Sequence, residues 1–185
     1  GRAVPACCTA VFAADFMHFA QTRMATIDTY AVFFILLMYL FMYLWLTEQR
    51  LWQLALCGLC FGLGAASKWT CLYAGAGLAL LWALHWLIRG RERGFMAFLK
   101  NSAFCLVFFV LIPGLIYYAS YYPYGAARGL GGIGAFFTRE YFDIVISNQE
   151  FMFSYHSGVD ATHPYSSTWY QWLLNIRPIL YYLEY

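Results

Sequence analysis

The sequence has few charged residues, since only 11% of its 185 residues are Asp, Glu, Lys or Arg, while 63% are hydrophobic. One soluble core of this size does not need so much apolar surface. The strands of a transmembrane barrel would give weakly alternating segments of about ten residues, whereas this chain has continuous apolar runs. A helix forms its backbone hydrogen bonds within itself, so it can cross lipid, which offers none. The composition therefore predicts an all-α, polytopic transmembrane helical bundle.

The motifs of soluble cofactor chemistry are also missing. The glycine-rich segment 129–134 has neither the preceding strand nor the following lysine of a phosphate-binding loop. Cys57 and Cys60 form a C-x-x-C motif without a second pair or a nearby histidine, so packing between helices explains them better than a metal or redox site. The sequence therefore assigns no metal site and no cofactor, and a divalent-metal requirement stays open. No nucleic-acid partner is expected.

Five apolar segments are long enough, or nearly so, to cross the hydrocarbon core of a bilayer. We expect them at residues 4–20, 30–46, 51–66, 70–88 and 103–122, with the start of a sixth at 176–185. The polar loop 123–175 completes a single transmembrane domain. Within it, residues 136–153 place polar and apolar side chains on different helical faces, which predicts an amphipathic helix on the membrane surface. The sequence has no initiator methionine, so we expect an internal fragment of a larger protein.

The basic residues between spans predict the orientation of the chain. Most of them fall in one alternating set of loops, namely Arg2, Arg50, Arg89, Arg91, Arg93 and Lys100. The positive-inside rule makes these loops cytoplasmic. The polar segment around Arg23, the short turn at Lys68 and the loop 123–175 then lie on the outer face.

Arg23 and Lys68 are cations at the outer ends of neighbouring predicted spans. Two convergent cations at an interface favour an anion, because arginine binds phosphate with two parallel contacts and lysine adds a compact charge. The alternative is that each side chain only extends toward lipid headgroups. Lys68 lies in a four-residue turn between apolar spans and has no acidic neighbour in the sequence. We therefore interpret it as the stronger candidate for a phosphate site.

Three further ionisable residues lie near these cations. Asp28 opens a predicted span, so it either caps the helix N-terminus or orients a neighbouring group. If the whole stretch is helical, positions five apart point about 140° away from each other, so Arg23 and Asp28 need other partners. Asp15 and His18 either face the same polar cavity or make an interhelical hydrogen bond.

The outer loop is dense in hydrogen-bonding side chains. Its candidate substrate residues are His156, His163, Tyr165, Ser166, Ser167 and Arg177. Such density beside a membrane suits recognition of a sugar or a phosphate, whereas the alternative is an ordinary capped loop. Two histidines seven positions apart are weak support for a metal, with Asp160 as the one acidic residue able to join them.

Three sequence blocks carry a family resemblance. In order along the chain, these blocks are DFMHFAQTRMATIDTYAVFF, GLGAASKWTCLYAGAGL and YHSGVDATHPYSSTWYQWLLNIRPILYY. In their sequence, order and spacing, they resemble the protein O-mannosyltransferase family, in its bacterial phospholipid-carrier-dependent branch. The resemblance implies a membrane glycosyltransferase of the GT-C type. Its donor is a polyprenyl-phosphate sugar, typically mannose, and its acceptor is a Ser or Thr hydroxyl of a translocated protein.

The resemblance also implies residue roles. Arg23 and Asp28 match the R-x-x-x-x-D segment of the family, and Lys68 matches the lysine of its K-W segment. The outer-loop block is matched by His163, Tyr165, Ser166, Ser167 and Arg177. We expect Arg23 and Lys68 to bind the donor phosphate and Asp28 to orient a neighbour. The catalytic Asp–Glu pair of the family is expected upstream of Gly1.

Two other functions remain open on the sequence. One is a GT-C transferase that acts on a glycolipid or a cell-wall polymer, and the other is a non-enzymatic lipid transporter or scaffold. Internal inverted repeats would support transport, and the sequence contains none. We expect an integral protein of a bacterial plasma membrane that contacts membrane lipids, with its active site on the extracytoplasmic face. The exact sugar, the acceptor and the oligomeric state stay open.

Overall fold

The structure is a computed structural model that describes residues 3–23, 26–158, 166–168, 170–171, 174 and 176. These described residues form helices, turns and irregular segments, without a strand among them. The prediction of an all-α fold is therefore confirmed. The chain forms two compact units, residues 1–138 and residues 139–185.

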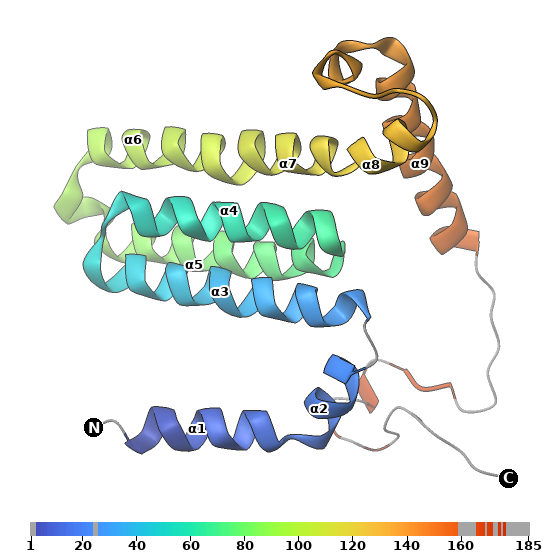
Figure 1. Ribbon diagram of the computed structural model, residues 1–185. Coiled ribbons are helices and arrows are strands. Elements are labelled where there is room, and N and C mark those ends of the chain that lie inside the picture. Colours follow the sequence, from blue (N-terminus) through green and yellow to red (C-terminus); the bar gives the residue numbers. More distant parts are fainter. Residues whose placement is uncertain are drawn as a thin grey trace, which may run out of the picture. The chain divides into compact units, whose positions relative to one another are not determined.

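The first unit contains eight of the described α-helices, a π-helical turn and a short 3₁₀ helix (Figure 1). Its α-helices are α1 (Ala3–Ala14), α2 (Phe16–Arg23), α3 (Ile27–Glu48), α4 (Leu51–Ser67), α5 (Thr70–Arg93), α6 (Phe95–Leu106), α7 (Ile112–Ser120) and α8 (Tyr122–Ala127). The π turn η1 (Val107–Leu111) joins α6 to α7, and the 3₁₀ helix η2 (Ile133–Phe137) follows α8.

Three described stretches are long and apolar enough to cross a membrane, namely Ile27–Glu48, Thr70–Gly90 and Phe95–Ala127. Helices α1 and α4 are apolar but shorter. The predicted spans 30–46, 51–66 and 70–88 fall inside α3, α4 and α5. Of the predicted sixth span, the structure describes Ile176 alone.

The predicted span 4–20 is interrupted in the structure. Helix α1 ends at Ala14, and α2 begins at Phe16. The backbone N–H of Asp15 donates to the carbonyl of Phe12 at 3.3 Å, three residues earlier, so the helical turn tightens at this position. Aspartate competes for backbone hydrogen bonds inside a helix, which makes it a suitable residue for such an interruption.

The helical stretch around the predicted span 103–122 is longer than the sequence indicates, and runs from Phe95 to Ala127. It begins directly after Gly94, which has a φ of 81° that favours glycine. In η1, the N–H of Ile112 donates to the carbonyl of Val107, five residues earlier. Pro113 comes next and has no N–H to donate, so the widened turn accommodates the proline without ending the helix.

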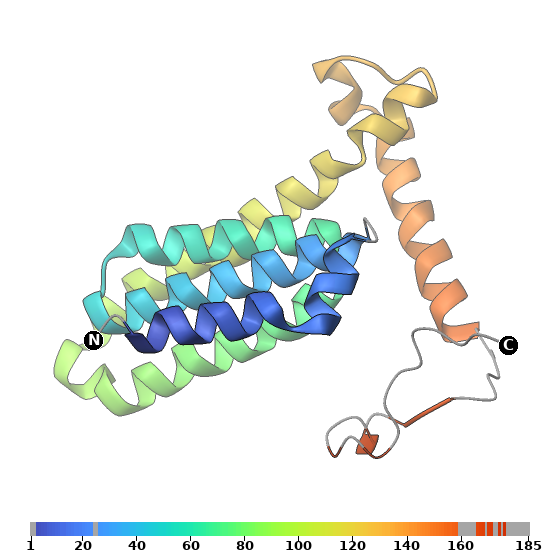
Figure 2. The same cartoon turned by 60° about the horizontal axis from the view of Figure 1, so that its bottom comes forward.

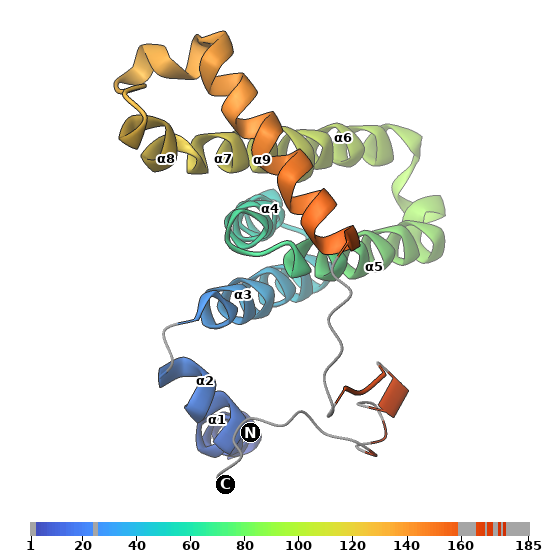
Figure 3. The ribbon, with the colours of Figure 1, turned by 90° about the vertical axis from the view of Figure 1, so that its right-hand side faces the viewer.

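Helix α4 lies between α3 and the α6–α7 stretch (Figures 1 and 3). Helices α3 and α4 are an antiparallel pair, seen side by side in Figure 2. Their contact surface, together with α5, contains a cluster of buried side chains: Met38, Met42, Trp45, Leu54, Cys57, Cys60 and Leu78. Cys57 and Cys60 thus belong to the packing between helices, in agreement with their interpretation from the sequence.

Glycine allows α4 to approach η1 and α7 closely. A Cβ atom on Gly58 would lie 2.3 Å from the carbonyl oxygen of Phe108, and one on Gly62 would lie 3.0 Å from the Cα of Pro113. Larger side chains at these two positions would force the helices apart. Small residues at such spacing are a common means of packing helices in membranes.

The second unit contains α9 (Arg139–Gly158), which covers most of the amphipathic helix predicted over residues 136–153. Tyr141 and Val145, four positions apart, are its buried residues. Arg139 and Asp143 form an exposed ion pair on another face, with 3.8 Å between Nε and Oδ2. The position of α9 on a membrane surface stays a prediction.

Candidate functional site

Lys68 lies in the short turn between α4 and α5. Its backbone N–H donates to the carbonyl of Gly64 at 2.9 Å and so closes α4. Its own carbonyl accepts from the N–H of Cys71 at 3.0 Å, which begins α5. Hydrogen bonds on both sides thus fix the backbone of Lys68, and a cation at the C-terminus of α4 is favoured by the helix dipole.

Asp28 lies in the first turn of α3, one residue after the helix begins. Thr26 occupies the N-cap position, without a side-chain cap. The carboxylate of Asp28 therefore does not cap the helix, although its charge is favourable near a helix N-terminus. Its partner comes from another helix.

The ammonium group of Lys68 donates a hydrogen bond to Oδ1 of Asp28 and forms an ion pair with it. The two residues are 40 positions apart in the sequence. Because α3 and α4 are antiparallel, the start of the one helix lies beside the end of the other. Lys68 has no acidic neighbour in the sequence. The packing of α3 against α4 therefore brings the carboxylate of Asp28 into contact with it.

This ion pair is partly exposed, with 32% of the Lys68 side chain and 49% of the Asp28 side chain accessible. Pairs of this exposure contribute only about 0.2–1 kcal/mol to stability because water screens them. The pair is better suited to holding the ammonium group in place than to stabilising the fold. An ammonium group that is held but accessible can bind an incoming anion.

Arg23 is the last residue of α2 and is exposed. Its guanidinium group lies over the ring of Phe19, 5.0 Å from the ring centroid, a cation–π contact within one helix turn. Arg23 and Asp28 belong to different helices, so they are not an intrahelical pair. Helices α2 and α3 are in contact. The convergence of Arg23 with Lys68 stays a prediction.

Trp69 adds a contact that the sequence did not predict. Its indole Nε1–H donates to the hydroxyl of Tyr117, in α7, at 2.9 Å. The ring of Tyr117 also meets that of Tyr121 edge-on, at 5.8 Å between centroids. The K-W segment identified this turn from the sequence. The hydrogen-bond partner of Trp69 could not be recognised from the local sequence, because it lies 48 positions away. The turn that carries Lys68 is thus attached to α3 through Asp28 and to α7 through Trp69.

The outer-loop candidates are only partly described. His156 is exposed near the end of α9, with its ring edge-on to that of Tyr155 at 5.3 Å. Ser166 is exposed, and Ser167 is partly buried. His163, Tyr165 and Arg177 lie outside the described residues, as does Asp160. The side chain of His18, the partner considered for Asp15, is also outside them. The substrate role of this group stays a prediction.

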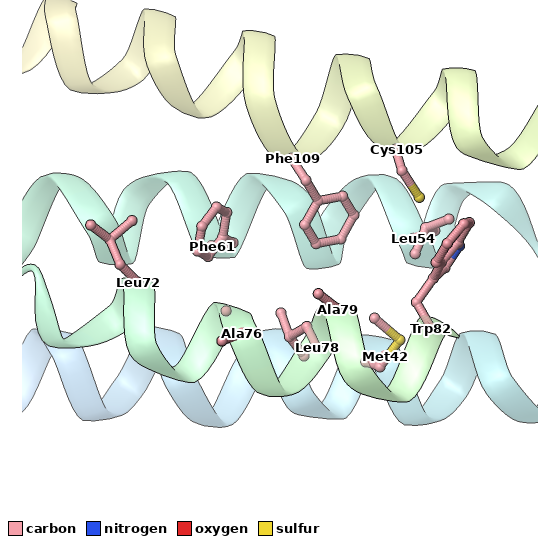
Figure 4. Close-up of a pocket in the computed structure, with 11 residues that line it drawn as sticks. Met42, Leu54, Phe61, Leu72, Ala76, Leu78, Ala79, Trp82, Cys105 and Phe109 are labelled. Atoms are coloured by element: carbon pink, nitrogen blue, oxygen red, sulfur yellow. The ribbon is translucent and has the colours of Figure 1, made fainter. Parts of the chain in front are cut away.

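An apolar cavity of about 380 Å³ lies between α5 and the α6–η1 segment, against α4 (Figure 4). It is lined by Met42, Leu54, Phe61, Leu72, Gly75, Ala76, Leu78, Ala79, Trp82, Cys105 and Phe109. No charged side chain lines it, so it fits a hydrocarbon ligand rather than a reacting centre. Leu72, at one end of this lining, lies near the start of α5, four positions after Lys68.

Metal-ligating side chains do not gather in the described part of the chain. Among these residues, no three His, Cys, Asp or Glu side chains are placed to hold an ion together.

Residues 2–124 match the model of a protein family described as dolichyl-phosphate-mannose-protein mannosyltransferase. The matched segment includes Arg23, Asp28, Lys68, Trp69 and Tyr117, and the outer-loop candidates follow it. No curated protein and no solved structure matches the chain.

Proposed function

Because the chain belongs to the dolichyl-phosphate-mannose-protein mannosyltransferase family, we propose that it transfers a mannosyl or related residue from a polyprenyl-phosphate carrier to Ser or Thr hydroxyls of translocated proteins. At the family level it is an integral membrane glycosyltransferase of the GT-C type. We place the reaction on the outer face of a bacterial plasma membrane. The reason is that the basic residues of the predicted inner loops belong to the helix ends opposite to the Lys68 turn.

The reaction exchanges one bond at the anomeric carbon for another. The acceptor oxygen attacks this carbon, the bond from the carbon to the phosphate oxygen breaks, and the carrier phosphate leaves with the electron pair. A carboxylate takes the hydroxyl proton. Cations stabilise the charge that develops on the phosphate. The transition state has oxocarbenium character, by analogy with glycoside hydrolysis.

Lys68 is the cation that we assign first to the donor phosphate. The observation that carries this assignment is the partly exposed ion pair with Asp28, at a turn fixed on both sides by backbone hydrogen bonds. A fixed cation loses little conformational entropy when it binds, so it stabilises the leaving phosphate more than a free lysine would. Arg23 is the second cation of this proposal.

Asp28 acts here as a positioning residue. Its carboxylate is engaged by Lys68 and lies in the first turn of α3, beside the N-terminus of that helix. Both features place the carboxylate where it can hold the lysine ammonium group. The Asp–Glu pair that the family resemblance implies would supply the base that accepts the hydroxyl proton.

The apolar cavity suits the carrier lipid. It is lined by hydrocarbon and aromatic side chains and reaches Leu72, four positions after Lys68. A polyprenyl chain lying there would place its phosphate toward the cation. The family resemblance separately assigns a sugar or acceptor role to the outer loop, with His156, His163, Tyr165, Ser166, Ser167 and Arg177 as its candidates.

Reconstitution of the full-length protein in proteoliposomes tests this function. Labelled polyprenyl-phosphate mannose is supplied with either a Ser/Thr peptide or a glycolipid acceptor. We expect label on the peptide, and we expect loss of transfer in the Arg23→Ala and Lys68→Ala variants. Transfer of label to the glycolipid alone would instead establish a GT-C transferase that acts on a glycolipid. Unchanged peptide transfer in both variants would overturn the phosphate assignment.

A further inference from the structure

Three aromatic side chains gather at the turn that carries Lys68. Trp69 follows the lysine directly and keeps 37% of its surface accessible. Tyr117 accepts the hydrogen bond from its indole N–H, and Tyr121 packs edge-on against Tyr117. An exposed aromatic surface therefore lies next to the cation assigned to the donor phosphate.

The hydrogen bond fixes the tryptophan ring without using its faces. An indole N–H lies in the plane of the ring, so its bond to the Tyr117 hydroxyl, 2.9 Å long, holds the ring at its edge. A hydrogen bond at the ring edge occupies neither face of the ring, and part of the Trp69 surface is accessible. Preorganisation of this kind lowers the entropy lost on binding.

The packing of α7 on α4 sets the position of Tyr117. Gly62 allows Pro113 and Ile116, just before this tyrosine, to lie directly against α4. This close approach brings the tyrosine hydroxyl within reach of the turn at the end of α4. The aromatic surface is thus built by two helices and belongs to the helical framework.

We propose that Trp69, oriented by Tyr117, offers a ring face as the subsite for the hexose ring of the lipid-linked donor. The apolar C–H face of a pyranose stacks on an indole ring, while the phosphate attached to the same anomeric carbon reaches the Lys68 ammonium group. The two contacts come from consecutive residues of the chain, and the sugar and the phosphate are likewise adjacent in the donor. This inference rests on the proposed function, because it assumes that Lys68 binds the carrier phosphate.

Binding of two carriers by the full-length protein tests this subsite. Polyprenyl phosphate and polyprenyl-phosphate mannose are each titrated in nanodiscs, and the ratio of their dissociation constants gives the sugar preference. Trp69→Ala removes the proposed platform. Tyr117→Phe keeps both rings but removes the hydrogen bond between them. Trp52→Ala is the matched control, since Trp52 is exposed at the start of α4, the opposite end of that helix.

We expect Trp69→Ala to weaken binding of the mannosylated carrier roughly five- to tenfold, as for loss of an aromatic contact. Binding of the bare phosphate carrier should stay unchanged. Tyr117→Phe should lower the sugar preference less, and Trp52→Ala should not change it. Trp69→Phe should restore part of the preference, because a smaller ring still offers a face.

An equal effect of Trp69→Ala on both carriers, or no effect on either, would overturn the subsite and make Trp69 a member of the interfacial aromatic belt. Equal binding of both carriers by the unsubstituted protein would overturn it as well. Peptide mannosylation is measured in the same preparations. A Trp69-dependent sugar preference without transfer would refute the proposed function and leave the subsite standing.

Discussion

The ammonium group of Lys68, at the end of α4, donates a hydrogen bond to the carboxylate of Asp28, in the first turn of α3, 40 positions earlier. The pair joins the end of one helix to the start of its antiparallel neighbour. Each charge is placed at the helix terminus that its sign favours. The pair therefore presents a fixed cation at one end of the bundle, and this cation is the basis of the proposed donor site.

Replacement of Asp28 by Asn tests the positioning role. The change keeps the side-chain shape but removes the charge that holds Lys68, so we expect kcat for mannosyl transfer to fall roughly tenfold, less than the ~10²-fold loss for removal of a stabilising group itself. Thermal stability should change little, since a partly exposed pair contributes about 0.2–1 kcal/mol. Steady-state kinetics with varied donor measure the effect.

The charge-swapped variant Asp28→Lys with Lys68→Asp is the control for this role. It can restore an ion pair between α3 and α4 while moving the cation to the other helix. We expect it to remain as inactive as Lys68→Ala. Recovery of transfer in the swapped protein would show that the pair only connects the two helices.

Gly58 tests the close packing of α4 against η1. A methyl group at this position would lie 2.3 Å from the carbonyl oxygen of Phe108, so Gly58→Ala should destabilise the bundle by roughly 1–3 kcal/mol through overpacking. Gly114→Ala is the matched control, because a Cβ there meets no atom within 4 Å. Thermal unfolding in detergent compares the two variants. Equal stability would contradict the observed contact.

Tyr39 tests the attachment of α3 to α5. Its hydroxyl donates to the carbonyl of Ala74 at 3.0 Å. Tyr39→Phe should therefore lower stability by about 0.5–1.5 kcal/mol, the usual net value of one hydrogen bond. Tyr43→Phe provides the comparison, since Tyr43 is 62% exposed on the same helix. A larger loss for Tyr43→Phe than for Tyr39→Phe would speak against this hydrogen bond.

Cysteine labelling tests the orientation inferred from charge. Helix α5 connects the Lys68 turn to the basic end at Arg93, so the two ends should face opposite sides of the membrane. Ser67→Cys should react with an impermeant maleimide in intact cells, and Glu92→Cys only after permeabilisation. The unsubstituted chain measures the background from its six native cysteines. The reverse pattern would invert the proposed topology.

Much of the helical framework could be predicted from the sequence, because apolar runs 30–46, 51–66 and 70–88 carry no charge that interrupts them. The start of α6 could not be predicted, since the charge of Lys100 indicated a loop before the span at residues 103–122. Lys100 is exposed and Asn101 donates to the carbonyl of Ala97 at 3.4 Å, so the helix includes both polar residues.

The candidate site could be located but not assembled from the sequence. Lys68 was identified by its charge in a short turn between apolar spans, and Asp28 by its place at a helix start. Their mutual contact could not be predicted, because it depends on the register in which α3 packs against α4. The Trp69–Tyr117 hydrogen bond depends in the same way on how closely α7 approaches α4, which the glycines determine.

The most direct test of the central claim is the affinity of the full-length protein for polyprenyl phosphate in the Lys68→Gln and Lys100→Gln variants. Both variants remove one lysine charge, but Lys100 is exposed on α6, away from the ion pair with Asp28. We predict that Lys68→Gln weakens binding of the phosphate carrier about tenfold, as for loss of a charge-assisted contact, while Lys100→Gln leaves it unchanged. Equal affinity of the two variants for the phosphate carrier would contradict the account.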